Sequence, residues 1–184
     1  MTTNHSFTPY RTTHNPAGHG PHHLMLGTVA VSRLLSSEQS GGQLSLVELI
    51  GAPGSGPGPH IDSWRETFYV LEGELTFRVD ENEGVRTIVA RTGDVVSIPI
   101  GVGHAFSVTG RTPARYLMGG TAAGIDAFFA DAGEPIASAT LPSPPPPFDR
   151  ERLRAAFAKY NLAPHSFPAE GAAVGASRQG SCEP

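Results

Sequence analysis

The sequence predicts an all-β fold, in which antiparallel strands form a sandwich or barrel and short helices follow. Between residues 24 and 122 the chain contains about eight short apolar segments, each bounded by glycine, proline, asparagine or aspartate, and this spacing is typical of sandwiches and barrels. None of these segments has the period of 3.6 residues that marks an amphipathic helix. A helical pattern begins only after residue 123.

Clear turn signals separate the strands in the first part of the chain. Residues 26–35 and 42–50 are separated by the sequence SSEQSGG, which predicts two strands joined by a turn. Residues 66–80 are apolar and aromatic on both sides of Glu72 and Gly73, which predicts a hairpin at that point. Further strands are predicted at residues 85–90, 94–100, 104–109 and 114–120.

Helices are predicted only after this β-rich region. Residues 124–136 have a short amphipathic pattern, which Gly133 and Pro135 are expected to end. The proline-rich residues 142–147 predict a stiff spacer. A second helix is predicted to begin at Asp149, which can act as its N-cap. The apolar stripe of this helix consists of Leu153, Ala156, Phe157 and Tyr160.

These patterns divide the chain into four parts. We expect a flexible, histidine-rich arm at residues 1–23, a β-barrel at residues 24–122, a helical and proline-rich extension that packs on the barrel at residues 123–164, and a disordered tail at residues 165–184. The arm contains His5, His14, His19, His22 and His23 among the 8 histidines of the chain. Such histidines bind metal only when several of them converge.

Composition restricts the classes of partner. The 13 basic and 17 acidic residues give a formal net charge of −4, whereas nucleic-acid binding normally requires a basic face. The chain has no apolar run of the roughly 20 residues that span a bilayer, and its N-terminal residues lack the basic start and apolar block of a secretory signal. The single cysteine, Cys182, can form no internal disulfide. The sequence therefore predicts a cytoplasmic protein that binds neither nucleic acid nor membranes.

Three polar side chains lie at the start of one apolar segment. His60, Asp62 and Glu66 have the same parity, and residues of one parity share a face of an extended strand. Phe68 and Val70 follow on that face and would form an apolar floor. Imidazole and carboxylate groups together bind divalent transition metals such as Fe, Ni, Co, Mn, Cu or Zn. The segment is therefore a candidate metal site.

Two segments resemble the two sequence motifs of the cupin superfamily. The sequence GSGPGPHIDSWRETFYVLEG resembles the first motif, with matching positions at Gly54, His60, Glu66 and Gly73. The sequence GDVVSIPIGVGHAFSV resembles the second, with matching positions at Gly93, Pro99, Gly101 and His104. The resemblance covers about residues 40–120 and implies a cupin-type antiparallel β-barrel, which is a double-sheet jelly roll. In such a barrel His104 would meet the first three polar residues.

The chain departs from this family pattern at two positions. Asp62 stands where the family has a second histidine, and Val108 stands where an asparagine often closes the second motif. A cupin normally holds its metal with three histidines and one glutamate. This chain keeps His60, Glu66 and His104, which are the ligand types of the facial-triad iron oxygenases.

The role of Asp62 stays open at this point. Its carboxylate ends nearer the backbone than the far nitrogen of an imidazole, so direct ligation requires the strand to move inward or a bridging water. One alternative is that the protein has lost high-affinity metal and uses the polar cluster to bind a substrate. Another is that His22 or His23 folds in as a substitute ligand.

A looser resemblance extends beyond the barrel. Residues 119–136, the proline-rich spacer and the closing helix resemble single-domain bacterial cupins of the quercetin 2,3-dioxygenase-like group, in which helices cover the mouth of the barrel. This implies a metal-dependent dioxygenase that acts with O2 on a flavonol-like or other enolic aromatic substrate. It also implies one divalent transition metal, a homodimer, Glu66 as the base, and a pocket lined by Trp64, Phe68, Val70 and Phe106.

Two other functions remain open because the fold hosts many reactions. The first is a non-oxidative polyketide cyclase or isomerase, in which Glu66, His60 or Asp62 would act as acid and base and metal would be optional. The second is a non-enzymatic protein that binds a small molecule. The sequence before the barrel contains no pair of DNA-binding helices, which disfavours a cupin-type transcription regulator.

Overall fold

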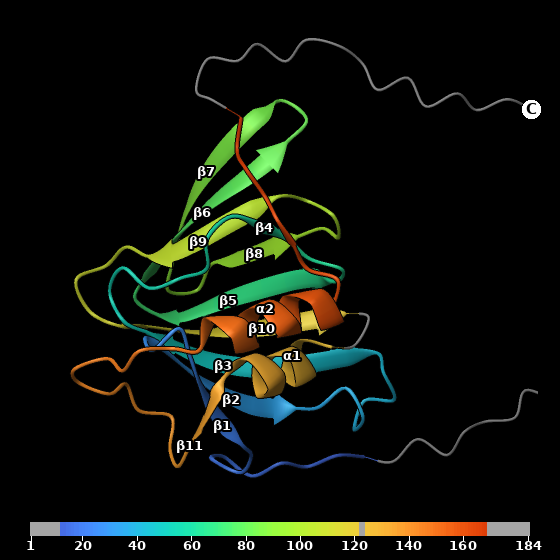
Figure 1. Cartoon of the computed structure of the whole chain (residues 1–184), viewed down its shortest axis with the longest axis vertical. Helices are drawn as coiled ribbons and strands as arrows, with labels where there is room; N and C mark the ends of the chain where they lie inside the picture. The colour runs from blue at the N-terminus through green and yellow to red at the C-terminus, as the bar shows by residue number, and fades with distance from the viewer. Residues whose placement is uncertain (1–11, 122–123, 169–184) are drawn as a thin grey trace, which may run out of the picture.

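Two antiparallel β-sheets pack face to face and enclose the core of the protein (Figure 1). The computed structural model describes residues 12–121 and 124–168 of the 184-residue chain. Residues 1–11 of the predicted arm and residues 169–184 of the predicted tail, with Cys182, lie outside the described residues. The two-sheet arrangement confirms the predicted all-β, double-sheet fold.

The larger sheet has seven strands in the order β11-β1-β2-β3-β10-β5-β8. Its strands are β1 (His22–Met25), β2 (Val29–Leu35), β3 (Leu44–Gly51), β5 (Arg65–Glu72), β8 (Val95–Ile98), β10 (Ala114–Thr121) and β11 (Glu134–Ile136). The smaller sheet has five strands in the order β12-β4-β9-β6-β7. Its strands are β4 (His60–Ile61), β6 (Glu74–Glu81), β7 (Gly84–Arg91), β9 (His104–Val108) and β12 (Ala163–Pro164).

The predicted hairpin at Glu72 and Gly73 is wrong. Strand β5 pairs with β10 and β8, whereas β6 pairs with β7 and β9, so the two consecutive strands belong to different sheets. Gly73 has φ +86°, and a Cβ atom there would lie 2.9 Å from Cα of Ala114. The glycine therefore forms the corner where the chain passes from one sheet to the other. The apolar pattern is the same for a hairpin and a corner, because both strands face one core.

Other strand boundaries differ from the prediction by small amounts. Strands β2 and β3 pair antiparallel, which confirms the predicted strand pair. Strand β1 begins at His22 and pairs with β2 and β11, so the barrel sheet starts two residues before the expected boundary. Strands β4, β11 and β12 have only two or three residues each, which is too short for a period to show in the sequence.

An aromatic cluster fills the space between the two sheets. The ring centroid of Phe68 lies 5.0 Å from those of Phe77 and Phe106, and the centroids of Phe106 and Tyr116 are 6.0 Å apart. These rings come from β5, β6, β9 and β10, which represent both sheets. The cluster forms a close-packed apolar floor below the polar residues described next.

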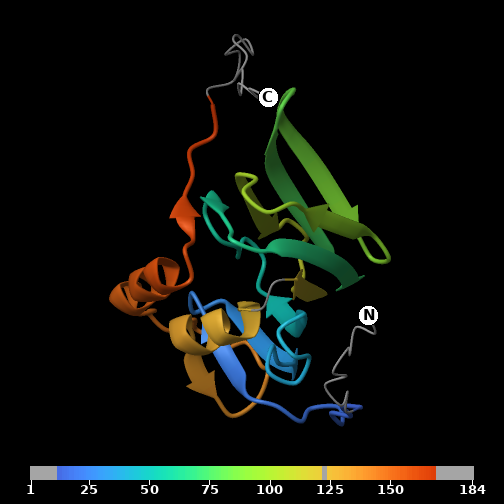
Figure 2. The same cartoon turned by 90° about the vertical axis from the view of Figure 1, so that its right-hand side faces the viewer.

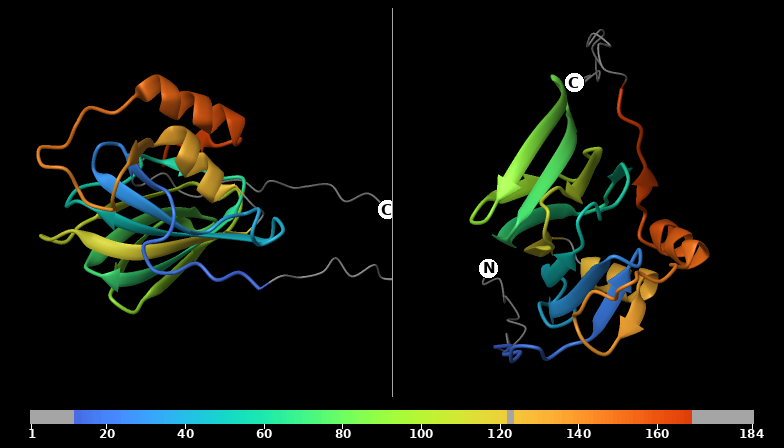
Figure 3. Two further views of the ribbon diagram at one scale, coloured as in Figure 1. Left: turned by 90° about the horizontal axis from the view of Figure 1, so that it is seen from below. Right: turned by 90° about the vertical axis from the view of Figure 1, so that its left-hand side faces the viewer.

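Two helices cover one side of the barrel. Helices α1 (Ile125–Ala132) and α2 (Arg150–Lys159) lie next to each other on the same side of the sheets in three views (Figures 1, 2 and 3). Asp149 accepts hydrogen bonds from the backbone N–H groups of Glu151 and Arg152, which confirms it as the N-cap of α2. Neither helix is long and apolar enough to cross a membrane among the residues that the structure describes.

Polar contacts join the two helices to each other and to the barrel. Lys159 Nζ and the Tyr160 hydroxyl donate to Asp131 Oδ2 at 2.6 and 2.7 Å. After α2 the chain runs along the barrel (Figure 2), and β12 pairs with β4. His165 Nε2 then lies 3.0 Å from Asp80 Oδ2. The helical extension is therefore attached at both of its ends.

Candidate metal centre

The four residues that the sequence selects as metal ligands come together between the two sheets. His60 begins β4, Asp62 lies in the loop between β4 and β5, Glu66 is the second residue of β5, and His104 begins β9. His60 and His104 face each other as a pair in the antiparallel strands β4 and β9. The barrel therefore supplies His104 from a strand distant in the sequence.

Residues 60–66 do not form one extended strand, and this corrects the expectation from their parity. Strand β4 belongs to the five-stranded sheet and β5 to the seven-stranded sheet, so the segment crosses from one sheet to the other. The backbone N–H of Gly101 donates to the Asp62 carbonyl at 3.2 Å, and Ser63 Oγ donates to the Tyr160 carbonyl at 2.9 Å. These bonds hold the loop so that the Asp62 side chain points between the sheets.

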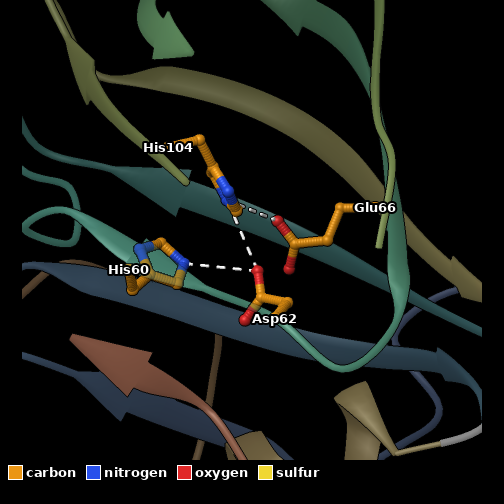
Figure 4. A group of neighbouring side chains, drawn as sticks. All are labelled: His60, Asp62, Glu66 and His104. Atoms are coloured by element: carbon orange, nitrogen blue, oxygen red, sulfur yellow. Dashed lines mark ion pairs between the residues drawn. The ribbon is translucent and has the colours of Figure 1, made fainter. Parts of the chain in front are cut away.

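The donor atoms of the cluster are close to one another (Figure 4). Asp62 Oδ2 lies 3.4 Å from Nε2 of both His60 and His104, and His104 Nε2 lies 3.3 Å from Glu66 Oε2. One donor atom from each of the four residues lies within 4.8 Å of all the others. Each residue is at most 6% exposed. Atoms bound to one metal at about 2.1 Å lie roughly 3.0 to 3.4 Å apart, so the spacing fits a shared cation.

Backbone carbonyls orient both imidazoles toward the centre of the cluster. His60 Nδ1 lies 2.9 Å from the Gly58 carbonyl, and His104 Nδ1 lies 3.0 Å from the Val102 carbonyl. A carbonyl only accepts, so Nδ1 carries the hydrogen in each ring. A neutral imidazole of this tautomer has its lone pair on Nε2, which is the arrangement of a metal-ligating histidine.

Several atoms that face the centre have no hydrogen-bond partner among the described residues. They are both carboxylate oxygens of Asp62, Oε2 of Glu66 and Nε2 of His104. In contrast, Glu66 Oε1 accepts a hydrogen bond from the Trp64 indole N–H at 3.1 Å. Buried carboxylates without a partner are costly. A divalent transition metal bound by these nitrogen and oxygen atoms would satisfy them, so the residues present fit such an ion.

The charges of the cluster also act on the groups around it. Burial disfavours the charged form of His60, but the nearby carboxylates of Asp62 and Glu66 outweigh burial and raise the pKa of His60. Protons and a metal therefore compete for this site. Burial, with a smaller contribution from Glu66, raises the pKa of the Tyr116 hydroxyl. Tyr116 therefore stays protonated at neutral pH.

The histidines of the predicted arm do not supply a substitute ligand among the described residues. His22 Nδ1 lies 2.9 Å from Ser32 Oγ on the neighbouring strand, and neither His22 nor His23 belongs to the cluster. His14 and His19 are exposed. His5 lies outside the described residues.

An apolar cavity adjoins the cluster. It has a volume of about 140 Å³. Of the four predicted pocket residues, Trp64 and Phe106 line this cavity, whereas Phe68 and Val70 are not among its lining residues. Phe68 and Val70 lie deeper in the barrel and are fully buried in the core. They share the parity of Glu66, but they belong to the core between the two sheets.

The sequence analysis missed several residues that line the cavity. The helical extension supplies Ile125, Phe128, Phe129, Leu153, Phe157 and Leu162. The barrel supplies further residues, including Met25, Val29, Leu49, Tyr116 and Met118. The apolar stripe of α2 indicated that this helix packs against something, but the sequence contained no signal for the cavity as its target.

A conservative substitution of Asp62 tests its place in the cluster. Asp62→Asn keeps the size of the side chain and removes its negative charge. We expect the dissociation constant for Zn²⁺ to rise about 10- to 100-fold, the range for perturbed metal surroundings. Titration against a chromophoric chelator measures it. Asp94→Asn, at an exposed aspartate of the β7–β8 turn, is the control. Equal affinities would mean that the Asp62 carboxylate takes no part in binding.

Comparison with known proteins agrees with these observations. Residues 48–120 match the family described as Cupin domain. The 3-hydroxyanthranilate 3,4-dioxygenases of Bos taurus and Homo sapiens are 36% and 37% identical over 59 residues. That stretch is 32% of this chain and only 21% of each enzyme, so the chain spans a minor part of these curated relatives.

Solved structures share the fold at low sequence identity. An RmlC-like cupin from Shewanella frigidimarina is 20% identical with a TM-score of 0.51, over 64% of this chain and 97% of that one. The polyketide cyclase RemF from Streptomyces resistomycificus is 18% identical with a TM-score of 0.50, over 61% and 80%. At these identities the likeness concerns the fold alone. Residues 48–120, the part of the chain that matches the family described as Cupin domain, include all four residues of the cluster.

Proposed function

We propose that the protein is a metal-dependent dioxygenase that acts on an enolic or hydroxylated aromatic small molecule. The observation that carries the proposal is the buried cluster of two imidazoles and two carboxylates at the end of an apolar cavity. Two histidines and one carboxylate are the ligand types of non-haem iron oxygenases. The local similarity to enzymes named 3-hydroxyanthranilate 3,4-dioxygenase supports the same type of reaction.

Each residue of the cluster has a distinct part in this proposal. A divalent metal held by His60, Glu66 and His104, with Asp62 as a further ligand, would supply Lewis acidity toward a substrate hydroxyl and a site for O2. Glu66 lines the cavity, and its Oε2 has no hydrogen-bond partner in the protein. In this proposal the Glu66 carboxylate binds the metal and also accepts the proton of the substrate hydroxyl. The Trp64 N–H holds the other oxygen and fixes the orientation of the carboxylate.

The walls of the cavity exclude water from the reacting ring. Aromatic and aliphatic side chains from both sheets and both helices surround the space beside the cluster. Exclusion of water prevents hydrolysis of reactive intermediates and proton leakage. Tyr116 adds a buried hydroxyl that stays protonated, because burial raises its pKa.

Metal analysis combined with oxygen uptake tests the proposal. The protein, purified without a histidine tag or chelator, is expected to contain about one transition metal per chain, as one cluster can hold. It is also expected to consume O2 when a catechol-bearing aromatic is added. This O2 uptake is expected to stop after dialysis against a chelator. Metal-loaded protein that consumes no O2 with a panel of such aromatics would contradict the proposal.

A non-oxidative cyclase or isomerase is the second candidate. It is supported by the raised pKa of His60 beside Asp62, because this pair can donate and accept a proton without a metal. The same experiment separates the two candidates, since turnover of an added polyketide without O2 uptake favours the cyclase. A protein that only binds its ligand would keep its ligand affinity after Glu66→Gln and show no turnover of either kind.

A further inference from the structure

We infer that this site takes an uncharged, single-ring aromatic, with its hydroxyl groups at the cluster and only hydrocarbon along its other edges. The position of the ligand's hydroxyl groups at the cluster rests on the proposed function. The size and charge of the ligand are inferred from the cavity. It narrows the flavonol-like or other enolic aromatic substrates that the sequence predicts. Three separate properties of the site support it.

The first property is the size of the cavity. Its volume of about 140 Å³ is close to that of an engineered cavity of about 150 Å³ that binds benzene. Sites for drug-sized molecules are larger, typically about 300 to 1,000 Å³. The cavity therefore matches one ring with small substituents. A flavonol has three rings and exceeds this volume.

The second property is the lack of a cation in the walls. Among the residues that the structure describes, no lysine or arginine lines the cavity. Two basic residues of α2 are engaged in ion pairs, since Arg152 pairs with Glu134 at 3.0 Å and Lys159 with Asp131 at 2.6 Å. The polar groups of the walls lie mainly at the cluster. A carboxylate on the far side of the ring would therefore be buried without a partner, which is unfavourable.

The third property is the charge of the cluster itself. The carboxylates of Asp62 and Glu66 together carry two negative charges and would neutralise a divalent cation. The three histidines and one glutamate of the usual cupin set would leave one positive charge. Asp62 in place of a histidine therefore removes the net charge that would attract an anionic substrate.

These properties separate the chain from the enzymes that it resembles locally. The curated relatives are named for 3-hydroxyanthranilate, which carries a carboxylate on its ring. The cavity described above fits a ring of that size but offers no partner for that carboxylate. We therefore expect the same type of ring with an uncharged substituent instead.

A pair of nearly isosteric ligands tests the charge of the substrate. The full-length protein is loaded with Zn²⁺, which is redox-inert, so that binding is measured without turnover. Calorimetric titration compares 4-methylcatechol with 3,4-dihydroxybenzoate, which differ by a methyl group against a carboxylate. We expect 4-methylcatechol to bind about tenfold tighter or more, and quercetin to bind more weakly than 4-methylcatechol. If 3,4-dihydroxybenzoate binds as tightly as 4-methylcatechol, the inference on charge is overturned. If quercetin binds as tightly as 4-methylcatechol, the inference on size is overturned.

A charge introduced at the rim of the cavity gives a second test. Leu153 is half-buried on α2 and lines the cavity, so Leu153→Arg would place a guanidinium beside the ring. We expect 3,4-dihydroxybenzoate to gain about tenfold in affinity and 4-methylcatechol to gain nothing. Ala155→Arg adds the same charge to an exposed position of the same helix and is the control. Thermal unfolding checks both variants, and the ligand pair on the unmodified protein decides the question if Leu153→Arg does not fold.

The two proposals fail in different ways. If the metal-loaded protein binds 4-methylcatechol selectively but takes up no O2, the inferred ligand class stands and the proposed dioxygenase activity is wrong. Oxygen uptake with an anionic or three-ring substrate would keep the dioxygenase and remove the inferred ligand class. Binding of none of the three ligands to protein that holds its metal would also overturn the inference.

Discussion

Replacing His104 with alanine is expected to remove the metal from the protein. His104 is 1% exposed, and its Nε2 lies within 3.4 Å of carboxylate oxygens from both Asp62 and Glu66. Without His104 the centre keeps one imidazole and two carboxylates. Asp62 and Glu66 then lose the one ligand that the second sequence motif supplies. We expect the loss of affinity to exceed the roughly 10- to 100-fold cost of removing a group that only orients a ligand.

Elemental analysis of the purified protein measures this effect. Metal content is expected to fall from about one ion per chain to a small fraction of that, because a single cluster provides the site. His19→Ala is the matched control, since His19 is exposed and lies outside the cluster. Unchanged occupancy in His104→Ala, with the control also unchanged, would show that the metal is bound elsewhere.

Glu66→Gln is expected to abolish turnover while the protein stays folded. Glutamine has nearly the same shape, and its amide oxygen can still accept the hydrogen bond from the Trp64 indole. The substitution removes the proton acceptor at Oε2 and one negative charge facing the imidazole of His104. Loss of a general base lowers the rate of proton transfer by about 10²- to 10⁴-fold, and weaker metal binding adds to this loss.

Oxygen uptake at saturating metal and substrate separates these two contributions. Metal in excess restores occupancy, so any remaining deficit in kcat reflects the reaction itself and not the loss of metal. Glu72→Gln is the control, because Glu72 lies on the same strand with a side chain that is 68% exposed. An unchanged kcat in Glu66→Gln at saturating metal would show that Glu66 is not the base. Asp62 would then be the carboxylate to test next.

The sequence by itself determined most of the longer strands and selected all four residues of the cluster, with the role of Asp62 left open. Alternation of apolar and polar residues is a local property, and the spacing of His60, Glu66 and His104 within two motifs is local as well. The N-cap at Asp149 was predictable for the same reason, because capping depends on the next three residues. Each of these features depends on residues that are neighbours in the chain.

The tertiary structure alone decided where those elements go. Periodicity states which side chains share a face of a strand but not which sheet receives the strand. The corner at Gly73 and the crossing between β4 and β5 were therefore not predictable. Asp62 reaches the centre because its loop is held by Gly101 and by the end of α2. The cavity likewise exists because two helices dock over the barrel, and such docking depends on contacts between residues far apart in the chain.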